Sequence, residues 1–108
     1  MLMRLTYSSQ LTPDVTAGKL DSLIARAAAR NRSLGITGIL AVENNRICQI
    51  LEGPVDEVAL LYERIKVDLR HVGVVELDRR EIGSRRFQDW GMARGRMIEI
   101  VELAFEVA

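Results

Sequence analysis

The sequence predicts an α+β fold in which two helices cover one face of a mixed β-sheet. Three observations support it: apolar residues alternate in several short segments, they recur at helical spacing in two longer segments, and turn residues separate the two kinds. The resulting order is strand, helix, strand, strand, helix, strand and one more short strand, which is the order of a ferredoxin-like βαββαβ sandwich with an added fifth strand. A right-handed crossover places both helices on the same face, and the groove between them is then the natural ligand site.

The first half of the chain supplies a strand, a helix and a hairpin. In the first strand, alternation places Met3, Leu5 and Tyr7 on one face. The pair Asn44-Asn45 forms the hairpin turn. The elements expected in this half are a strand over residues 2–8, a helix from about residue 16 that ends before Gly35, and hairpin strands over residues 36–42 and 47–51.

The second half supplies a second helix and two more strands. Pro54 lies at an early helical position, where its missing N–H costs no hydrogen bond, and apolar side chains follow it at helical spacing. The elements expected here are a helix opened by Gly53-Pro54, a strand over residues 72–77, a basic loop over 82–87, a short fifth strand over 90–94 and a third helix over 97–107. We therefore expect one folded domain over residues 1–96 and a C-terminal helical segment over residues 97–108.

The composition narrows the class of protein. The chain has 108 residues, enough for one domain, and its 15 Lys and Arg residues balance 15 Asp and Glu residues. This zero net charge gives no electrostatic attraction to nucleic acid or to an anionic membrane. A single cysteine and a single histidine exclude an internal disulfide and a metal cluster of these residues. No apolar run approaches the roughly 20 residues of a membrane span, and no signal peptide is recognisable, so we expect a cytoplasmic protein without a metal.

Three polar residues are predicted to lie in the interior, where a plain core would not place them. Tyr7 is on the apolar face of its strand, Gln49 lies inside an apolar strand, and Asn31 falls near the end of the first helix. A buried glutamine without hydrogen bonds would destabilise the fold. Each residue taken alone also has a structural explanation, since Tyr7 can be a core residue and Asn31 a helix terminator. Composition and spacing alone therefore predict a small-ligand domain without identifying the ligand.

Taken together, these residues resemble the BLUF family of flavin-binding blue-light sensor domains. The segment Gln49-x-Leu51-Glu52-Gly53-Pro54 and its spacing from Tyr7 and Asn31 make the resemblance specific, and it runs from about residue 3 to residue 95. The other matching motifs are Tyr7-x-Ser9, Ile36-Thr37-Gly38, Asp68-x-Arg70-His71 and Arg86-Phe87-x-x-Trp90-x-Met92. The family usually carries an aromatic residue where this chain has Ile47, which changes the packing beside the site rather than its chemistry.

The resemblance implies a non-covalently bound flavin between the two helices, which is FAD with FMN or riboflavin as substitutes. Ile24 and Ile65 are implied as apolar walls, and Asn31 offers a carbonyl and an amide to the edge of the ring. The full set of residues implied to contact the flavin is Tyr7, Ile24, Arg30, Asn31, Gln49, Arg64, Ile65 and Asp68. No glycine-rich dinucleotide fingerprint is present, so the phosphates are expected to be held loosely or to remain in solvent.

The charged members of this set have a second interpretation. Arg64 and Asp68 are four positions apart and are expected on one face of the second helix, from which the resemblance implies that they reach the ring edge. A solvated ion pair is the alternative for these two residues. For Arg30 the alternatives are a place near the ring or ribityl chain and a solvated helix end.

By the same resemblance the protein is a light sensor and not an enzyme. Light is implied to drive an electron from Tyr7 to the flavin, and a proton follows through Gln49. The amide of Gln49 has one end that donates and one that accepts, so its reorientation exchanges its partners and shifts the absorption to the red. The signal is expected to leave the site through the sheet to Trp90 and Met92.

The output of such a sensor passes to a downstream protein, which the sequence does not identify, or to the chain's own oligomeric state. Residues 97–105 are strongly apolar, and the sheet face opposite the two helices needs a cover. We therefore expect this segment to pack across that face and to share part of its apolar surface with a second copy in a homo-oligomer.

Two other classes of protein remain as alternatives. A small hydrolase of the acylphosphatase type would need an arginine in the loop after the first strand, and residues 8–12 contain none. A flavin-free interaction module would show no flavin absorption. Cys48 also suggests a cysteine–flavin adduct, but alternation turns it away from the face that carries Gln49.

Overall fold

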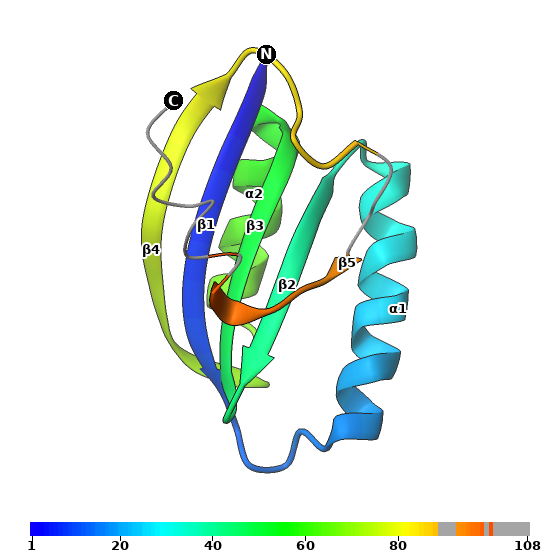
Figure 1. Ribbon diagram of the computed structural model, residues 1–108, viewed down its shortest axis with the longest axis vertical. Coiled ribbons are helices and arrows are strands. Elements are labelled where there is room, and N and C mark those ends of the chain that lie inside the picture. Colours follow the sequence, from blue (N-terminus) through cyan, green and yellow to red (C-terminus); the bar gives the residue numbers. More distant parts are fainter. Residues whose placement is uncertain (89–92, 99, 101–108) are drawn as a thin grey trace.

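The computed structural model describes residues 1–88, 93–98 and 100 of the chain, and within them it shows two helices and a five-stranded sheet (Figure 1). In chain order the elements are β1 (Leu2–Leu11), α1 (Ala17–Ser33), β2 (Thr37–Glu43), β3 (Arg46–Pro54), α2 (Val55–Lys66), β4 (His71–Ile82) and β5 (Ala93–Arg94). Residues 97, 98 and 100 are helical. The predicted order of elements is therefore confirmed.

The sheet has the strand order β4-β1-β3-β2-β5. The pairs β4–β1, β1–β3 and β3–β2 are antiparallel, whereas β5 runs parallel to β2. In Figure 1, α2 lies behind the sheet, and residues 93–98 lie in front of it. Because α2 packs on β1 and β3 while α1 packs on β2, both helices cover the same face, which we call the inner face. This is the ferredoxin-like α+β sandwich that the sequence predicts.

Local sequence explains where the first helix and the hairpin begin and end. The hydroxyl of Thr16 accepts a hydrogen bond from the backbone N–H of Lys19 at 3.3 Å, which caps the start of α1. Gly35 follows the last turn with a φ of 71°, a left-handed conformation that glycine adopts without strain. Asn44 and Asn45 have φ of 49° and 68°, as a two-residue hairpin turn requires.

Two apolar clusters pack between the sheet and the helices. The cluster against α2 contains Met3, Leu5, Tyr7, Ile36, Leu51, Val58, Leu61 and Tyr62. The cluster against α1 contains Leu11, Leu20, Leu40 and Ile47. Among the described residues, no helix is both long and apolar enough to cross a membrane.

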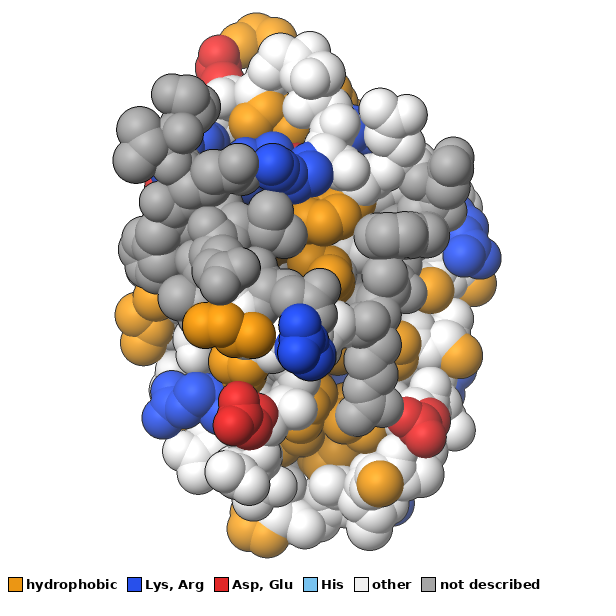
Figure 2. Space-filling model, viewed as in Figure 1, with side chains coloured by type: hydrophobic (Ala, Val, Ile, Leu, Met, Phe, Trp, Pro, Cys, Tyr) orange, Lys and Arg blue, Asp and Glu red, His pale blue; other side chains and the backbone are white. Residues whose placement is uncertain are grey.

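A third apolar cluster covers the opposite, outer face of the sheet. It contains Ile39, Ala41, Cys48, Ile50, Phe87 and Ile100, with Met97 packed against it. Figure 2 shows hydrophobic side chains in the middle of this face. Met97 and Ile100 thus pack on the open face, as predicted for the C-terminal segment, whose residues 99 and 101–108 lie outside the described part of the chain.

A buried carboxylate fastens the loop after β4 to the outer face. The side chain of Glu52 is fully buried on β3. Its Oε2 accepts a hydrogen bond from Nε of Arg4 at 2.8 Å. Its Oε1 accepts from the backbone N–H groups of Arg86 at 2.8 Å and Phe87 at 2.9 Å. Since both oxygens have strong donors, the cost of burying the charge is offset, and Phe87 is held over the outer cluster.

The fourth strand is longer than predicted. It runs over His71–Ile82 rather than residues 72–77, because it pairs with β1 along most of that strand's length. Register shifts occur opposite Thr6/Tyr7 and opposite Ser8/Gln10. Such irregularities interrupt the period of two by which a strand is recognised in a sequence.

The end of the second helix also differs from the prediction. Helix α2 stops at Lys66, so Asp68 lies beyond it and does not share a helix face with Arg64. Of the predicted fifth strand, Ala93 and Arg94 are paired with β2, while residues 90–92 lie outside the described residues.

Candidate functional site

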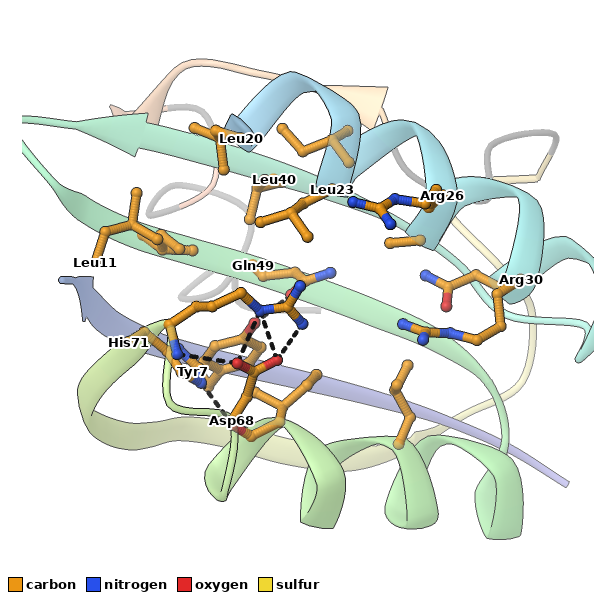
Figure 3. Close-up of a pocket in the computed structure, with 17 residues that line it drawn as sticks. Tyr7, Leu11, Leu20, Leu23, Arg26, Arg30, Leu40, Gln49, Asp68 and His71 are labelled. Atoms are coloured by element: carbon orange, nitrogen blue, oxygen red, sulfur yellow. Dashed lines mark hydrogen bonds and ion pairs between the residues drawn. The ribbon is translucent and has the colours of Figure 1, made fainter. Parts of the chain in front are cut away.

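A cavity of about 250 Å³ lies on the inner face of the sheet between the two helices. Figure 3 shows α1 and α2 on opposite sides of it, with β1 and β3 crossing between them. The residues that line it are Tyr7, Leu11, Leu20, Leu23, Ile24, Arg26, Ala27, Arg30, Asn31, Leu40, Ile47, Gln49, Leu61, Ile65, Asp68, Arg70 and His71. All of the predicted contact residues except Arg64 are among them. The structure therefore brings together most of the site that the sequence indicates.

Tyr7 and Gln49 form the centre of the cavity wall. They are directly opposite each other on the antiparallel strands β1 and β3, and each side chain is about 5% exposed or less. The hydroxyl of Tyr7 donates a hydrogen bond to Oε1 of Gln49. Figure 3 shows the amide nitrogen of Gln49 directed into the cavity. A buried phenol and an amide thus meet at the cavity wall, where a bound molecule could contact both.

Burial strongly favours the neutral form of the Tyr7 phenol. Desolvation raises its pKa far above the ordinary value, and the negative charge that Cys48 and Tyr62 would carry when ionised raises it further. The ring of Tyr7 also packs against Tyr62 at a centroid distance of 5.6 Å. Tyr7 is therefore a proton donor that does not ionise at neutral pH.

Asn31 has both of the roles that the sequence left open. Its backbone carbonyl accepts hydrogen bonds from the N–H of Leu34 at 3.0 Å and of Ile36 at 2.8 Å, at the end of α1. Its side chain is 1% exposed and lines the cavity. The main chain of Asn31 thus helps to end the helix, while its side-chain amide lies at the cavity wall.

An ion pair lies at the rim of the cavity just after α2. Nε of Arg70 donates to both carboxylate oxygens of Asp68, at 2.8 and 3.1 Å, and the Arg70 backbone N–H donates to Oδ1 at 3.0 Å. These hydrogen bonds are the main reason that the pKa of Asp68 is lowered to about 2. Sequence reasoning gave Arg70 no role, although the motif Asp68-x-Arg70-His71 contained the signal.

His71, at the start of β4, contacts β1 and α2 through both of its ring nitrogens at one end of the cavity. Its Nε2 lies 2.5 Å from the backbone carbonyl of Ile65, and its Nδ1 lies 2.7 Å from the hydroxyl of Ser9. A carbonyl only accepts, so Nε2 carries the proton, and in the neutral ring Nδ1 accepts from Ser9. His71 therefore joins β4 to β1 and to the end of α2.

Of the remaining predicted residues, one lines the cavity, one is exposed outside it and two are not described. Arg30 lines the cavity from α1, and so does Arg26, which sequence reasoning did not single out. Arg64 is exposed on α2 and is not in the lining. Trp90 and Met92 lie outside the described residues.

The residues that line the cavity suit a flat heteroaromatic molecule. Ile24 and Ile65 face it from the two helices and offer apolar surface to the faces of a ring. The amides of Asn31 and Gln49 offer donors and acceptors to its edge. Fold and site together therefore indicate a small domain with a site for a planar heteroaromatic ligand, and these residues suit the ring of a flavin.

Residues 2–93 match the family described as sensors of blue-light using FAD, abbreviated BLUF. The chain belongs to this family. The class of protein is thus a blue-light sensor whose cofactor is a flavin, as the sequence motifs imply. The match removes the hydrolase and the flavin-free module as alternatives for these residues.

Individual relatives support the same conclusion. The blue light- and temperature-regulated antirepressor BluF of Escherichia coli (strain K12) is 36% identical over 92 residues, which cover 85% of this chain and 23% of BluF. This chain therefore spans about a quarter of the length of that relative.

Two solved structures share the fold. The dark-state structure of BlrB, a BLUF protein, has a TM-score of 0.83 and 33% identity, covering 95% of this chain and 78% of BlrB. Klebsiella pneumoniae BlrP1 with FMN and cyclic diGMP has a TM-score of 0.83 and 42% identity, covering 89% of this chain and 26% of BlrP1. FMN is thus bound by a protein with the same fold, in agreement with FMN as a substitute for FAD.

Proposed function

We propose that Tyr7 and Gln49 form the light-sensitive element of this blue-light sensor. The observation that carries the proposal is their direct hydrogen bond at the wall of the cavity, where both side chains are buried. The bound flavin supplies absorption of blue light and an acceptor for one electron. Tyr7 is the donor of that electron, because no other tyrosine is present among the described residues that line the cavity.

Proton transfer follows from the position of Gln49. The raised pKa of Tyr7 keeps its proton in place in the dark. Loss of an electron makes a phenol a far stronger acid, and Oε1 of Gln49 is already hydrogen-bonded to the hydroxyl that must release the proton. If Gln49 accepts this proton at its oxygen and releases one from its nitrogen toward the flavin, its donor and acceptor sides are exchanged. An electron and a proton would then return to Tyr7 while the exchanged arrangement of Gln49 remains. Gln49 then presents a different group to the flavin, and the absorption moves to the red.

The other residues bind and orient the cofactor in this proposal. Ile24 and Ile65 contact the faces of the ring, whereas Asn31 and Asp68 contact its edge. Arg30 lies near the ring or the ribityl chain. Arg64 takes part only if its side chain turns from the exposed face of α2 toward the cavity.

The output is proposed to pass from Gln49 through the sheet to the segment that contains Trp90 and Met92, and then to a downstream protein or a second copy of the chain. Residues 1–96 form the sensor in this proposal, and residues 97–108 take part in the interface. We place the sensor in the cytoplasm, because its single cysteine needs no oxidising compartment.

The proposal is tested by comparing light-minus-dark absorption spectra of the flavin-loaded protein and two tyrosine variants. Tyr7→Phe removes the electron and proton donor but keeps the ring that packs in the core, so we expect bound flavin and no red shift. Tyr62→Phe is the matched control, because this buried tyrosine contacts Tyr7 but is not in the cavity lining. It should keep the red shift. A normal red shift in Tyr7→Phe would refute the proposed mechanism.

A further inference from the structure

We propose that Arg26 and Arg30 form a subsite for the phosphate of a phosphorylated flavin, so that this chain binds FMN and FAD in preference to riboflavin. The inference rests on the proposed function of the cavity and adds a chemical selectivity to it. It also replaces the expectation from the sequence that the phosphates are held loosely or remain in solvent.

The two arginines are placed together by the helix. They are four positions apart on α1, which puts them on the same face one turn apart. Both line the cavity. Figure 3 shows both guanidinium groups at the end of the cavity away from Leu11 and His71.

Neither arginine has a counter-charge within the described part of the chain. The third cavity arginine, Arg70, is held by Asp68, but the guanidinium groups of Arg26 and Arg30 make no ion pair or hydrogen bond with another described residue. Two like charges at this spacing repel each other and disfavour the helix. An anion bound between them would remove that repulsion.

The charges that line the cavity indicate which anion fits. Asp68 is the one carboxylate among the described lining residues, and Arg70 neutralises it. Arg26 and Arg30 therefore leave two positive charges, which match the two negative charges of a phosphate monoester at neutral pH. Guanidinium groups bind phosphate through paired, charge-assisted hydrogen bonds. FMN carries such a group, FAD carries a diphosphate in its place, and riboflavin carries neither.

The charge of the whole helix supports the same conclusion. Helix α1 contains Lys19, Arg26, Arg30 and Arg32 but a single acidic residue, Asp21, in a chain whose net charge is zero. The excess of positive charge is thus concentrated on the helix that forms one side of the cavity. Such a concentration of charge raises the local concentration of an anionic ligand at low ionic strength.

The test is a competition between flavins. The full chain is incubated with an equimolar excess of riboflavin and FMN, unbound flavin is removed, and the bound flavins are separated by chromatography and counted. We expect the wild-type protein to prefer FMN by at least about tenfold at low salt, as two charge-assisted hydrogen-bonding groups would give. Arg26→Gln and Arg30→Gln should each lower this ratio several-fold, and added salt should lower it in the wild type. FAD against riboflavin should give the same order.

Arg32→Gln is the matched control. It removes the same charge from an exposed position on the same helix, but Arg32 does not line the cavity, so the ratio should stay at its wild-type value. A wild-type ratio near one would overturn the subsite while leaving flavin binding intact. An equal loss in Arg32→Gln would show a general charge effect and would also overturn it. Failure to bind any flavin would refute the proposed function instead.

Discussion

Gln49 and Glu52 lie three residues apart on β3, both are buried, and they face opposite sides of the same sheet. On the outer face, Glu52 accepts hydrogen bonds from an arginine on β1 and from two successive backbone N–H groups of the loop after β4. On the inner face, Gln49 accepts from Tyr7 and borders a cavity. One strand thus carries two buried polar side chains in very different surroundings.

The difference separates a structural polar group from one that can change its partners. A carboxylate only accepts, and exchanging the fixed donors around Glu52 would require the loop to move. An amide can present either a donor or an acceptor in nearly the same volume. Gln49 can therefore exchange partners with little movement of the backbone, because its side chain borders a cavity rather than a packed core.

The largest effect on stability is expected from the outer face. Glu52→Ala leaves the Arg4 charge and two backbone N–H groups without their acceptor. We expect the free energy of unfolding to fall by about 3–5 kcal/mol, measured by urea denaturation. Gln49→Leu should lower it by less, about 1–2 kcal/mol, because the hydrogen bond that it removes from Tyr7 joins two neutral groups. Equal losses in the two variants would contradict the distinction between the faces.

A smaller effect, on binding rather than folding, is expected at the cavity. Asn31→Ala removes the side-chain amide but keeps the backbone carbonyl that helps to end α1. We expect flavin affinity to fall by about 1–3 kcal/mol, or about 5- to 150-fold, because polar atoms of the ring edge lose their partner. Titration of the flavin-free protein with flavin measures this loss. Unchanged affinity would leave Asn31 with its main-chain role alone.

The smallest effect is expected at the rim, and it depends on pH. The folded-state pKa of Asp68 is lowered to about 2 from 3.8, so its pair with Arg70 stabilises the fold above about pH 4, and this stabilisation is lost as the pH falls toward 2. The Arg70 side chain is 52% exposed, so solvent limits the contribution to less than about 1 kcal/mol. The difference in unfolding free energy between wild type and Arg70→Ala should be constant from pH 4 to 6 and should shrink below pH 4. A difference that grows below pH 4 would contradict this assignment.

The comparison of the two faces also explains what the sequence could predict. Alternation placed Tyr7 with Met3 and turned Cys48 away from Gln49, because a strand between two packed layers shows its period clearly. The motif around Gln49 identified the cavity wall. Those parts depend on residues that are close together in the sequence.

The parts that were missed depend on contacts between distant segments. The length of β4 is set by pairing with β1 across bulges, and the end of α2 at Lys66 separates Arg64 from Asp68. Arg26 has the pattern of an exposed helical charge, and only the packing of α1 beside the cavity shows that it lines a site. The three donors to Glu52 belong to residues that are between 34 and 48 positions away from it in the sequence.

The most direct test of the central claim uses light-minus-dark absorption spectra of the flavin-loaded wild type, Gln49→Leu and Cys48→Ala. The wild type should show a red-shifted product. Gln49→Leu should retain flavin but show no shift, because leucine has no amide to reorient. Cys48→Ala, the neighbouring position on the opposite face of β3, should keep the shift. A red-shifted product of wild-type size in Gln49→Leu would contradict the account.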